Sequence, residues 1–167
     1  MGRLARSVAT GLLAFVTYII YTGSIKFYDL VTGVIVACVV GLLTANITLT
    51  NVSKVFNPRR AAWLIAYAIK YFFYYEVKAH LDVMYRILHP RMPIRPGIVR
   101  VYYDVESDYA ITAVANSITN TPGTVVVDLD EKKRIYYVHW INVKGVEPEI
   151  TKGISKGFEF FAKRVFD

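Results

Sequence analysis

Lys70 and Glu76 are ionisable residues beside a run of aromatic and aliphatic side chains that contains few other charges. A charged group near lipid is costly and often marks a path for ions. Glu76 also has a local explanation, because His80 follows it by four residues and would lie next to it on a helix. Lys70 and Glu76 are therefore candidate ion-path residues, with pairing between Glu76 and His80 as the alternative.

The sequence contains no further arrangement of residues that indicates catalysis. It has no phosphate loop, dinucleotide fingerprint, nucleophile elbow or pair of histidines at metal-binding spacing. The single cysteine, Cys38, excludes a disulfide framework, a zinc site built from cysteines and an iron–sulfur cluster held by this chain alone. Because Cys38 lies within an apolar run, we expect it to be buried. We expect no cofactor, no metal site and no enzymatic activity.

The distribution of charge indicates a membrane protein rather than a nucleic-acid-binding protein. Residues 1–50 hold three Lys or Arg and one acid, whereas residues 51–100 hold nine Lys or Arg and two acids. Residues 101–167 hold eight Lys or Arg and ten acids, as in a water-soluble domain. A basic, aromatic segment next to an apolar one is typical of the cytoplasmic surface of a membrane. We therefore expect contact with lipid headgroups and none with nucleic acid.

Two apolar segments, Leu4 to Tyr21 and Leu30 to Leu49, are long enough to cross a bilayer as helices. Thr22-Gly23-Ser24 forms the turn between them. No small-residue cleavage site separates the two segments, so we expect the first to remain as a span and not to be a cleaved signal peptide. In the second segment Gly33, Ala37 and Gly41 recur every four residues, a spacing that lets another helix approach closely. We expect this stripe to pack on a helix of a neighbouring subunit, although small residues are also common in membrane helices.

A third helix is predicted from Pro58 to Leu88, because proline is favoured in the first turn of a helix. One stripe of this helix is polar and consists of Lys70, Lys78, Asp82 and Arg86. If the helix crossed the membrane, one of the basic clusters flanking it would lie outside, against the positive-inside tendency. This favours two spans plus a basic interfacial or re-entrant helix over three spans.

The remaining sequence predicts a small α+β domain. His89 to Gly97 contains three prolines and is expected to form an extended basic strap. Alternating and helical patterns then predict the order β-α-β-β-α, with the first two strands parallel, the helices on one face and the other face left to a partner or to the membrane. The expected organisation is a transmembrane hairpin over 1–57, an amphipathic interfacial or third membrane helix with its strap over 58–97, and a cytoplasmic domain over 98–167.

The most distinctive segment, Ala-Asn-Ser-Ile-Thr-Asn-Thr-Pro-Gly-Thr, runs from Ala115 to Thr124. It predicts the end of a helix and a Pro-Gly turn into a strand. The segment resembles the signature of the E subunit of the Mrp-type multisubunit sodium/proton antiporters, with Asn120 where the family commonly has Leu. As in that family, an Ile-Arg-Pro-Gly segment (94–97) precedes it and a Tyr-Val-His segment (137–139) follows it. The signature positions are Asn116, Thr119, Thr121, Pro122, Gly123 and Thr124.

The resemblance implies an accessory subunit in the plasma membrane. Related modules occur in archaeal membrane-bound hydrogenase and sulfur-reductase complexes, where cation/proton antiport is coupled to electron transfer in other subunits. The expected partners are the other membrane subunits of such a complex, and the signature turn is expected to be a structural or docking element. The alternative is a membrane-anchored binding protein whose soluble domain recruits a partner or lipid.

Overall fold

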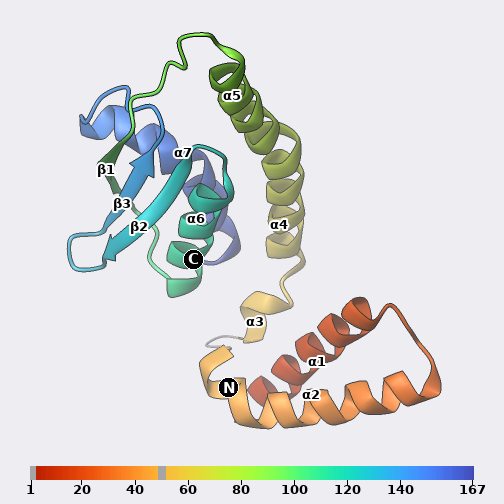
Figure 1. Cartoon of the computed structure of the whole chain (residues 1–167). Helices are drawn as coiled ribbons and strands as arrows, with labels where there is room; N and C mark the ends of the chain where they lie inside the picture. Colours follow the sequence, from red (N-terminus) through yellow and green to blue (C-terminus); the bar gives the residue numbers. More distant parts are fainter. Residues whose placement is uncertain (1–2, 49–51) are drawn as a thin grey trace. The chain divides into compact units, whose positions relative to one another are not determined.

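The computed structural model describes residues 3–48 and 52–167, and the chain divides into two compact units, Met1–Asn57 and Pro58–Asp167. The first unit contains α1 (Arg3–Thr22), α2 (Phe27–Thr48) and the short α3 (Val52–Val55) (Figure 1). Both α1 and α2 are long and apolar enough to cross a membrane. The prediction of two apolar helices is confirmed, although the predicted end of the second at Leu49 lies outside the described residues.

The small-residue stripe of α2 lies against α1 of the same chain. Gly33, Ala37 and Gly41 are buried, and a Cβ on Gly41 would lie 2.5 Å from the backbone oxygen of Ser7. The two helix backbones therefore approach too closely for larger side chains. The stripe was expected to pack on a helix of a neighbouring subunit. In the structure it packs on α1 of the same chain. The prediction that Cys38 is buried is wrong. Cys38 directly follows the buried Ala37 on α2 and is itself exposed.

The second unit begins with a continuous helical stretch from Pro58 to Leu88, in which α4 (Pro58–Lys70) and α5 (Val77–Leu88) flank a π-helical segment η1 (Tyr71–Glu76). This stretch belongs to the same compact unit as the α+β fold, so the structure gives no boundary at residue 97. The strap that follows is held to the rest of the second unit at Pro93 and Arg95. Arg86 binds the carbonyl oxygen of Pro93, and the backbone N–H of Arg95 donates to the carbonyl oxygen of Ile141 at 3.0 Å.

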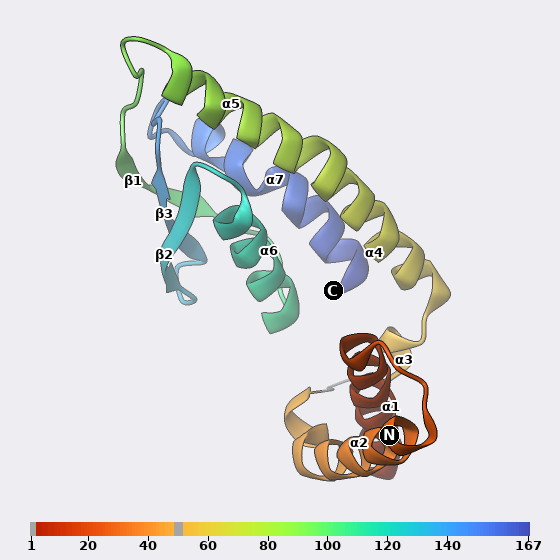
Figure 2. The same ribbon diagram turned by 45° about the vertical axis from the view of Figure 1, so that its right-hand side comes forward.

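The α+β fold has the predicted order β-α-β-β-α: β1 (Gly97–Tyr102), α6 (Asp108–Asn120), β2 (Thr124–Asp130), β3 (Ile135–Trp140) and α7 (Pro148–Val165). Because β3 lies between β1 and β2 and is antiparallel to both, the first two strands are parallel but not adjacent. Helices α6 and α7 cover one face of the sheet, and the helical stretch from α4 to α5 lies along the outer side of α7 (Figure 2).

The hydrophobic core lies between the sheet and the two helices. The alternation of β1 turns Val99 and Val101 inward, and they are less than 4% exposed. Val114 and Ile118 of α6 and Phe158 of α7 complete the core from the helical side. On the opposite face of the sheet Ile98 and Val125 are exposed, at 62% and 44%, so the described elements leave this face uncovered. That face is available to a partner or to the membrane surface.

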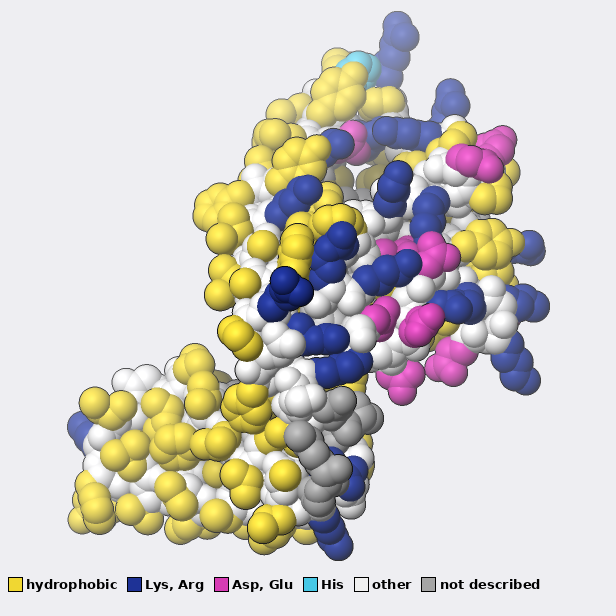
Figure 3. Space-filling model, turned by 180° about the vertical axis from the view of Figure 1, so that it is seen from behind, with side chains coloured by type: hydrophobic (Ala, Val, Ile, Leu, Met, Phe, Trp, Pro, Cys, Tyr) yellow, Lys and Arg dark blue, Asp and Glu magenta, His cyan; other side chains and the backbone are white. Residues whose placement is uncertain are grey.

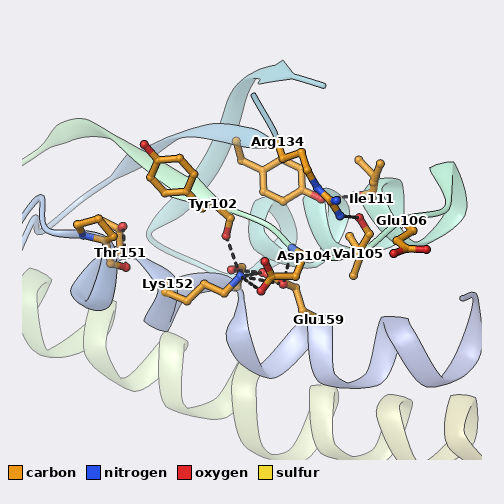
Figure 4. Close-up of polar contacts among 12 residues, drawn as sticks. Tyr102, Asp104, Val105, Glu106, Ile111, Arg134, Thr151, Lys152 and Glu159 are labelled. Carbon is orange, nitrogen blue, oxygen red and sulfur yellow. Dashed lines mark hydrogen bonds and ion pairs between the residues drawn. The ribbon is translucent and has the colours of Figure 1, made fainter. Parts of the chain in front are cut away.

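A partly buried charge network, centred on the buried Glu159, fastens the end of β1 to α7 (Figure 4). The Glu159 side chain is 5% exposed and accepts a hydrogen bond from the backbone N–H of Asp104 at 3.0 Å. Lys152 donates to Glu159, to the Asp104 carboxylate and to the carbonyl oxygen of Tyr102, each at 2.9 Å. The hydrogen bond to Lys152 lowers the pKa of Asp104 below its ordinary value of 3.8. The network compensates a charge that burial would otherwise penalise.

Candidate functional site

A groove of about 950 Å³ opens between the helical stretch and α7 within the second unit. The polar stripe predicted from the sequence forms one wall, because Lys70, Lys78, Asp82 and Arg86 all line the groove. The other wall is built from α7 and from the loop that follows β3, which contributes Lys144. The signature turn, from Thr121 to Thr124, lies at the same groove. The most distinctive segment of the sequence thus meets the most basic stripe.

The signature residues hold the connection between α6 and β2. The Thr121 hydroxyl donates to the carbonyl oxygen of Ser117 and the Thr124 hydroxyl donates to that of Ile118, both at 2.7 Å. The Thr119 hydroxyl accepts from the backbone N–H of Val126 at 3.2 Å. Gly123 has a φ of +93°, a conformation that residues with a side chain rarely adopt. The Thr121 and Thr124 hydroxyls bind carbonyl oxygens at the end of α6, and Thr119 binds a backbone N–H of β2, so their immediate role is structural.

The other two signature residues have different positions. Pro122 lies just after the end of α6, and it lines the groove. Its ring prevents the helix from continuing. Asn116 is exposed on α6 and is not among the described residues that line the groove. The signature therefore combines a turn at the groove with one outward position.

Tyrosines of the helical stretch bind the same end of α6. The hydroxyls of Tyr67 and Ser117 are hydrogen bonded, and Tyr71 and Tyr75 pack against the core, with the ring centroid of Tyr75 5.0 Å from that of Phe158. Burial raises the pKa of Tyr67 to about 12 and, with Glu76, that of Tyr71 to about 12. Both hydroxyls therefore stay protonated at physiological pH and can donate hydrogen bonds to α6. This docking makes the helical stretch one wall of the groove.

The two candidate ion-path residues occupy different environments. The ammonium group of Lys70 lies 5.6 Å from the centroid of the Phe161 ring and lines the groove. Glu76 pairs with His80 at 3.3 Å and, within the described part of the chain, does not line the groove. The structure therefore does not bring Lys70 and Glu76 together in the groove. Their role in ion movement stays a prediction, which antiport by a complex carrying Glu76→Gln would test.

The side of the helical stretch that faces away from α7 is strongly apolar. Along this side the large side chains are exposed, from 47% for Leu64 to 78% for Phe73. Figure 3 shows yellow hydrophobic side chains along this edge of the second unit, next to a band of dark blue Lys and Arg side chains. We call this surface the apolar ridge; its members are Leu64, Ile65, Ile69, Phe72, Phe73 and Leu81. An exposed apolar surface with a basic border is typical of a helix at a membrane interface or of a protein contact.

Metal binding finds no support in the described ranges, 3–48 and 52–167, which contain no group of three or more His, Cys, Asp or Glu placed to hold an ion. The site therefore consists of positive charge, aromatic rings and hydroxyls. Such a set can bind anions or a protein surface.

The residues that complete the groove were not predicted from the sequence. Lys144 and Lys156 are in a loop and on α7, and no local pattern connects them with the stripe on the helical stretch. The contact between Tyr67 and Ser117 joins residues 50 positions apart, for which one sequence carries no signal. Gly157 had a weak signal, since glycine within an apolar helical pattern suggests close packing.

Gly157 of α7 makes room for Tyr75, because a Cβ at this position would lie 2.8 Å from the Cζ of the Tyr75 ring. We expect Gly157→Leu to weaken docking of the helical stretch by about 1–3 kcal/mol, the usual cost of overpacking. The measurement is hydrogen exchange of the backbone amides from Tyr71 to Glu76, which should become faster.

The matched control for this prediction is Gly153→Leu, one turn earlier on α7. A Cβ at Gly153 meets nothing within 4 Å, so the control should gain about 0.5–1 kcal/mol of helix stability. Equal exchange rates in the two variants would show that Gly157 does not hold Tyr75 in place.

Together, an apolar helical hairpin, an α+β unit and a basic groove beside an apolar ridge define a membrane-anchored protein with a binding surface and no visible catalytic centre among the described residues. Comparison with known proteins identifies the family within this class. The family model described as Na+/H+ ion antiporter subunit, MNHE, matches residues 11–165. The chain therefore belongs to this family of Na+/H+ antiporter subunits, which is a family of membrane proteins.

Individual relatives agree with this membership. The chain is 34% identical over 100 residues to the E subunit of the Na(+)/H(+) antiporter of Alkalihalophilus pseudofirmus, an alignment covering 60% of this chain and 63% of that relative. It is 25% identical over 167 residues to the E1 subunit of the Na(+)/H(+) antiporter of Staphylococcus saprophyticus, covering 97% and 98%. The chain thus aligns with less than two thirds of the first relative and with nearly all of the second.

One solved structure is similar over almost the whole chain. It is a chain of the membrane-bound sulfane sulfur reductase, an archaeal respiratory membrane complex, with 34% identity and a TM-score of 0.83. The match covers 97% of this chain and 99% of that one. It therefore includes both the apolar hairpin and the α+β unit.

Proposed function

We propose that this chain is an accessory membrane subunit of an Mrp-type cation/proton antiporter module, in which it supports assembly and ion translocation without catalytic or redox chemistry of its own. The observation that carries the proposal is the match along 97% of the chain to one subunit of an archaeal respiratory membrane complex. The curated relatives named as Na(+)/H(+) antiporter subunits support sodium as the exchanged cation. The host is an antiporter or a respiratory complex such as a hydrogenase or sulfur reductase.

The proposed placement has α1 and α2 crossing the plasma membrane and the second unit on the cytoplasmic side. The nine Lys and Arg residues between 51 and 100 support this orientation, because basic residues are retained on the cytoplasmic side. The helical stretch from Pro58 to Leu88 then lies at the interface, with its tyrosines on α7 and its apolar ridge toward lipid or a neighbouring subunit. The basic residues of this stretch and of the strap lie at the lipid headgroups.

Co-purification in a mild detergent tests the proposal. A tagged full-length chain should elute in a large complex together with antiporter-like membrane subunits, identified by mass spectrometry. A chain that elutes alone, or with one soluble protein in equal amount, would contradict the proposal and support a membrane-anchored binding protein. The exposed face of the sheet, with Ile98 and Val125, is where such a soluble partner would bind.

A further inference from the structure

Four lysines from separate parts of the fold line the groove: Lys70, Lys78, Lys144 and Lys156. All four are exposed, and no described carboxylate forms an ion pair with them. Asp82, the one acid among the described residues that line the groove, accepts two hydrogen bonds from Arg86, at 2.8 and 2.9 Å. The groove therefore carries positive charge that the described residues leave uncompensated. An anion bound there would relieve the repulsion among the lysines.

The walls between these lysines are largely aromatic and aliphatic. Tyr74, Trp140, Ile150 and Phe160 line the groove, and Phe160 is 44% exposed. Tyrosine and tryptophan are the residues that membrane proteins place at the level of the headgroups. A small hydrophilic anion would use the lysines but not the apolar surface of these side chains. The occupant that matches both kinds of wall is an amphiphile with an anionic head.

The apolar ridge extends this match beyond the groove. Phe72 and Phe73, which are 64% and 78% exposed, immediately precede Tyr74 on the same helical turn. A headgroup held by the lysines would thus have apolar surface beside it for the start of its hydrocarbon chains. The helical stretch supplies both surfaces, because its polar stripe lines the groove and its ridge faces outward (Figure 3).

We infer that the groove binds the phosphate headgroup of an anionic membrane lipid, with Lys70, Lys78, Lys144 and Lys156 around the phosphate and the hydrocarbon chains along the apolar ridge. The inference rests on the proposed position of the second unit at the membrane surface. It places the contact with lipid headgroups in this groove. The signature turn between Thr121 and Thr124 fixes one edge of the groove, which gives the turn a role in shaping a lipid site.

Binding is measured on the full chain in detergent by native mass spectrometry. Short-chain phosphatidylglycerol is titrated against phosphatidylcholine with the same chains, and inorganic phosphate forms a third arm. We expect phosphatidylglycerol to bind at least about tenfold more tightly than phosphatidylcholine, and its binding to weaken as salt is raised. Equal affinity for the two lipids would overturn the inference. Phosphate that binds as tightly as phosphatidylglycerol would identify a site for a soluble anion and overturn it as well.

A double variant locates the site. Each lysine near an anionic lipid surface contributes about a fivefold increase in affinity, so Lys78→Gln with Lys156→Gln should weaken phosphatidylglycerol binding roughly thirtyfold. The control, Lys132→Gln with Lys133→Gln, removes the same charge from the exposed turn between β2 and β3 and should bind as wild type. An equal loss in both variants would show that only net charge matters, which would overturn the assignment to the groove. Co-purification is scored separately: a wild-type chain that fails to enter a complex contradicts the proposed function, whatever the lipid titration shows.

Discussion

Replacing Gly41 with leucine is expected to separate α2 from α1 and to remove the chain from the proposed antiporter-type complex. A Cβ at position 41 would lie 2.5 Å from the backbone oxygen of Ser7 and 3.1 Å from the backbone nitrogen of Gly11. Backbone atoms cannot rotate away as side chains can, so the whole of α1 would have to move. We expect a cost at or above the upper end of the overpacking range, about 3 kcal/mol, or about a hundredfold in the pairing equilibrium.

The measurement is the amount of this chain relative to the other subunits in the detergent-purified complex. Val39→Leu is the matched control, because Val39 lies on the same helix, is 51% exposed and can take a larger side chain without meeting α1. Gly33→Leu should fall between the two, since its Cβ would meet side chains, at 2.9 Å from Tyr18 and 3.0 Å from Phe15. Wild-type stoichiometry in the Gly41 variant would mean that close approach of the two helices is not needed for assembly.

The small-residue stripe of α2 also shows what a sequence can and cannot predict about a membrane helix. The four-residue period of Gly33, Ala37 and Gly41 identifies the face that packs, because the period belongs to a single helix. It does not identify the helix on the other side, and α1 occupies the place that was assigned to a neighbouring subunit. The same limit explains Cys38, since an apolar run contains both packed and outward positions and hydrophobicity alone does not separate them.

The α+β unit was largely predictable because its signals are local. Alternation in the strands, caps at helix ends and the Pro-Gly turn each depend on residues within a few positions of one another. The order of the strands across the sheet, with β3 between β1 and β2, depends on pairings such as Val99 with Val138 that no local pattern specifies. The groove, like the strand order, depends on contacts between residues that are distant in the sequence. Its stripe on the helical stretch was visible in the sequence, whereas Lys144 and Lys156 join it only through the fold.

Lys152 of α7 is the cationic partner of the buried Glu159 carboxylate. We expect Lys152→Met to lower the free energy of unfolding of the second unit by roughly 3–5 kcal/mol, because it leaves the Glu159 carboxylate, 5% exposed, without its cationic partner. The measurement is chemical unfolding of the full chain in detergent, followed by circular dichroism in the aromatic region. Lys156→Met is the control, since Lys156 is exposed one turn later on α7 and should change stability by less than about 0.5 kcal/mol.

The pH dependence separates loss of charge compensation from loss of packing. Lys152 lowers the pKa of Asp104, so this carboxylate contributes stability that is complete above its ordinary pKa of 3.8 and is lost as the pH falls through the lower, folded value. The contribution requires Lys152, so the gap between wild type and Lys152→Met should be widest near neutral pH and should narrow below about pH 3.8. A gap that keeps the same size from about pH 7 to about pH 3 would indicate that the aliphatic part of Lys152, and not its charge, stabilises the link between β1 and α7.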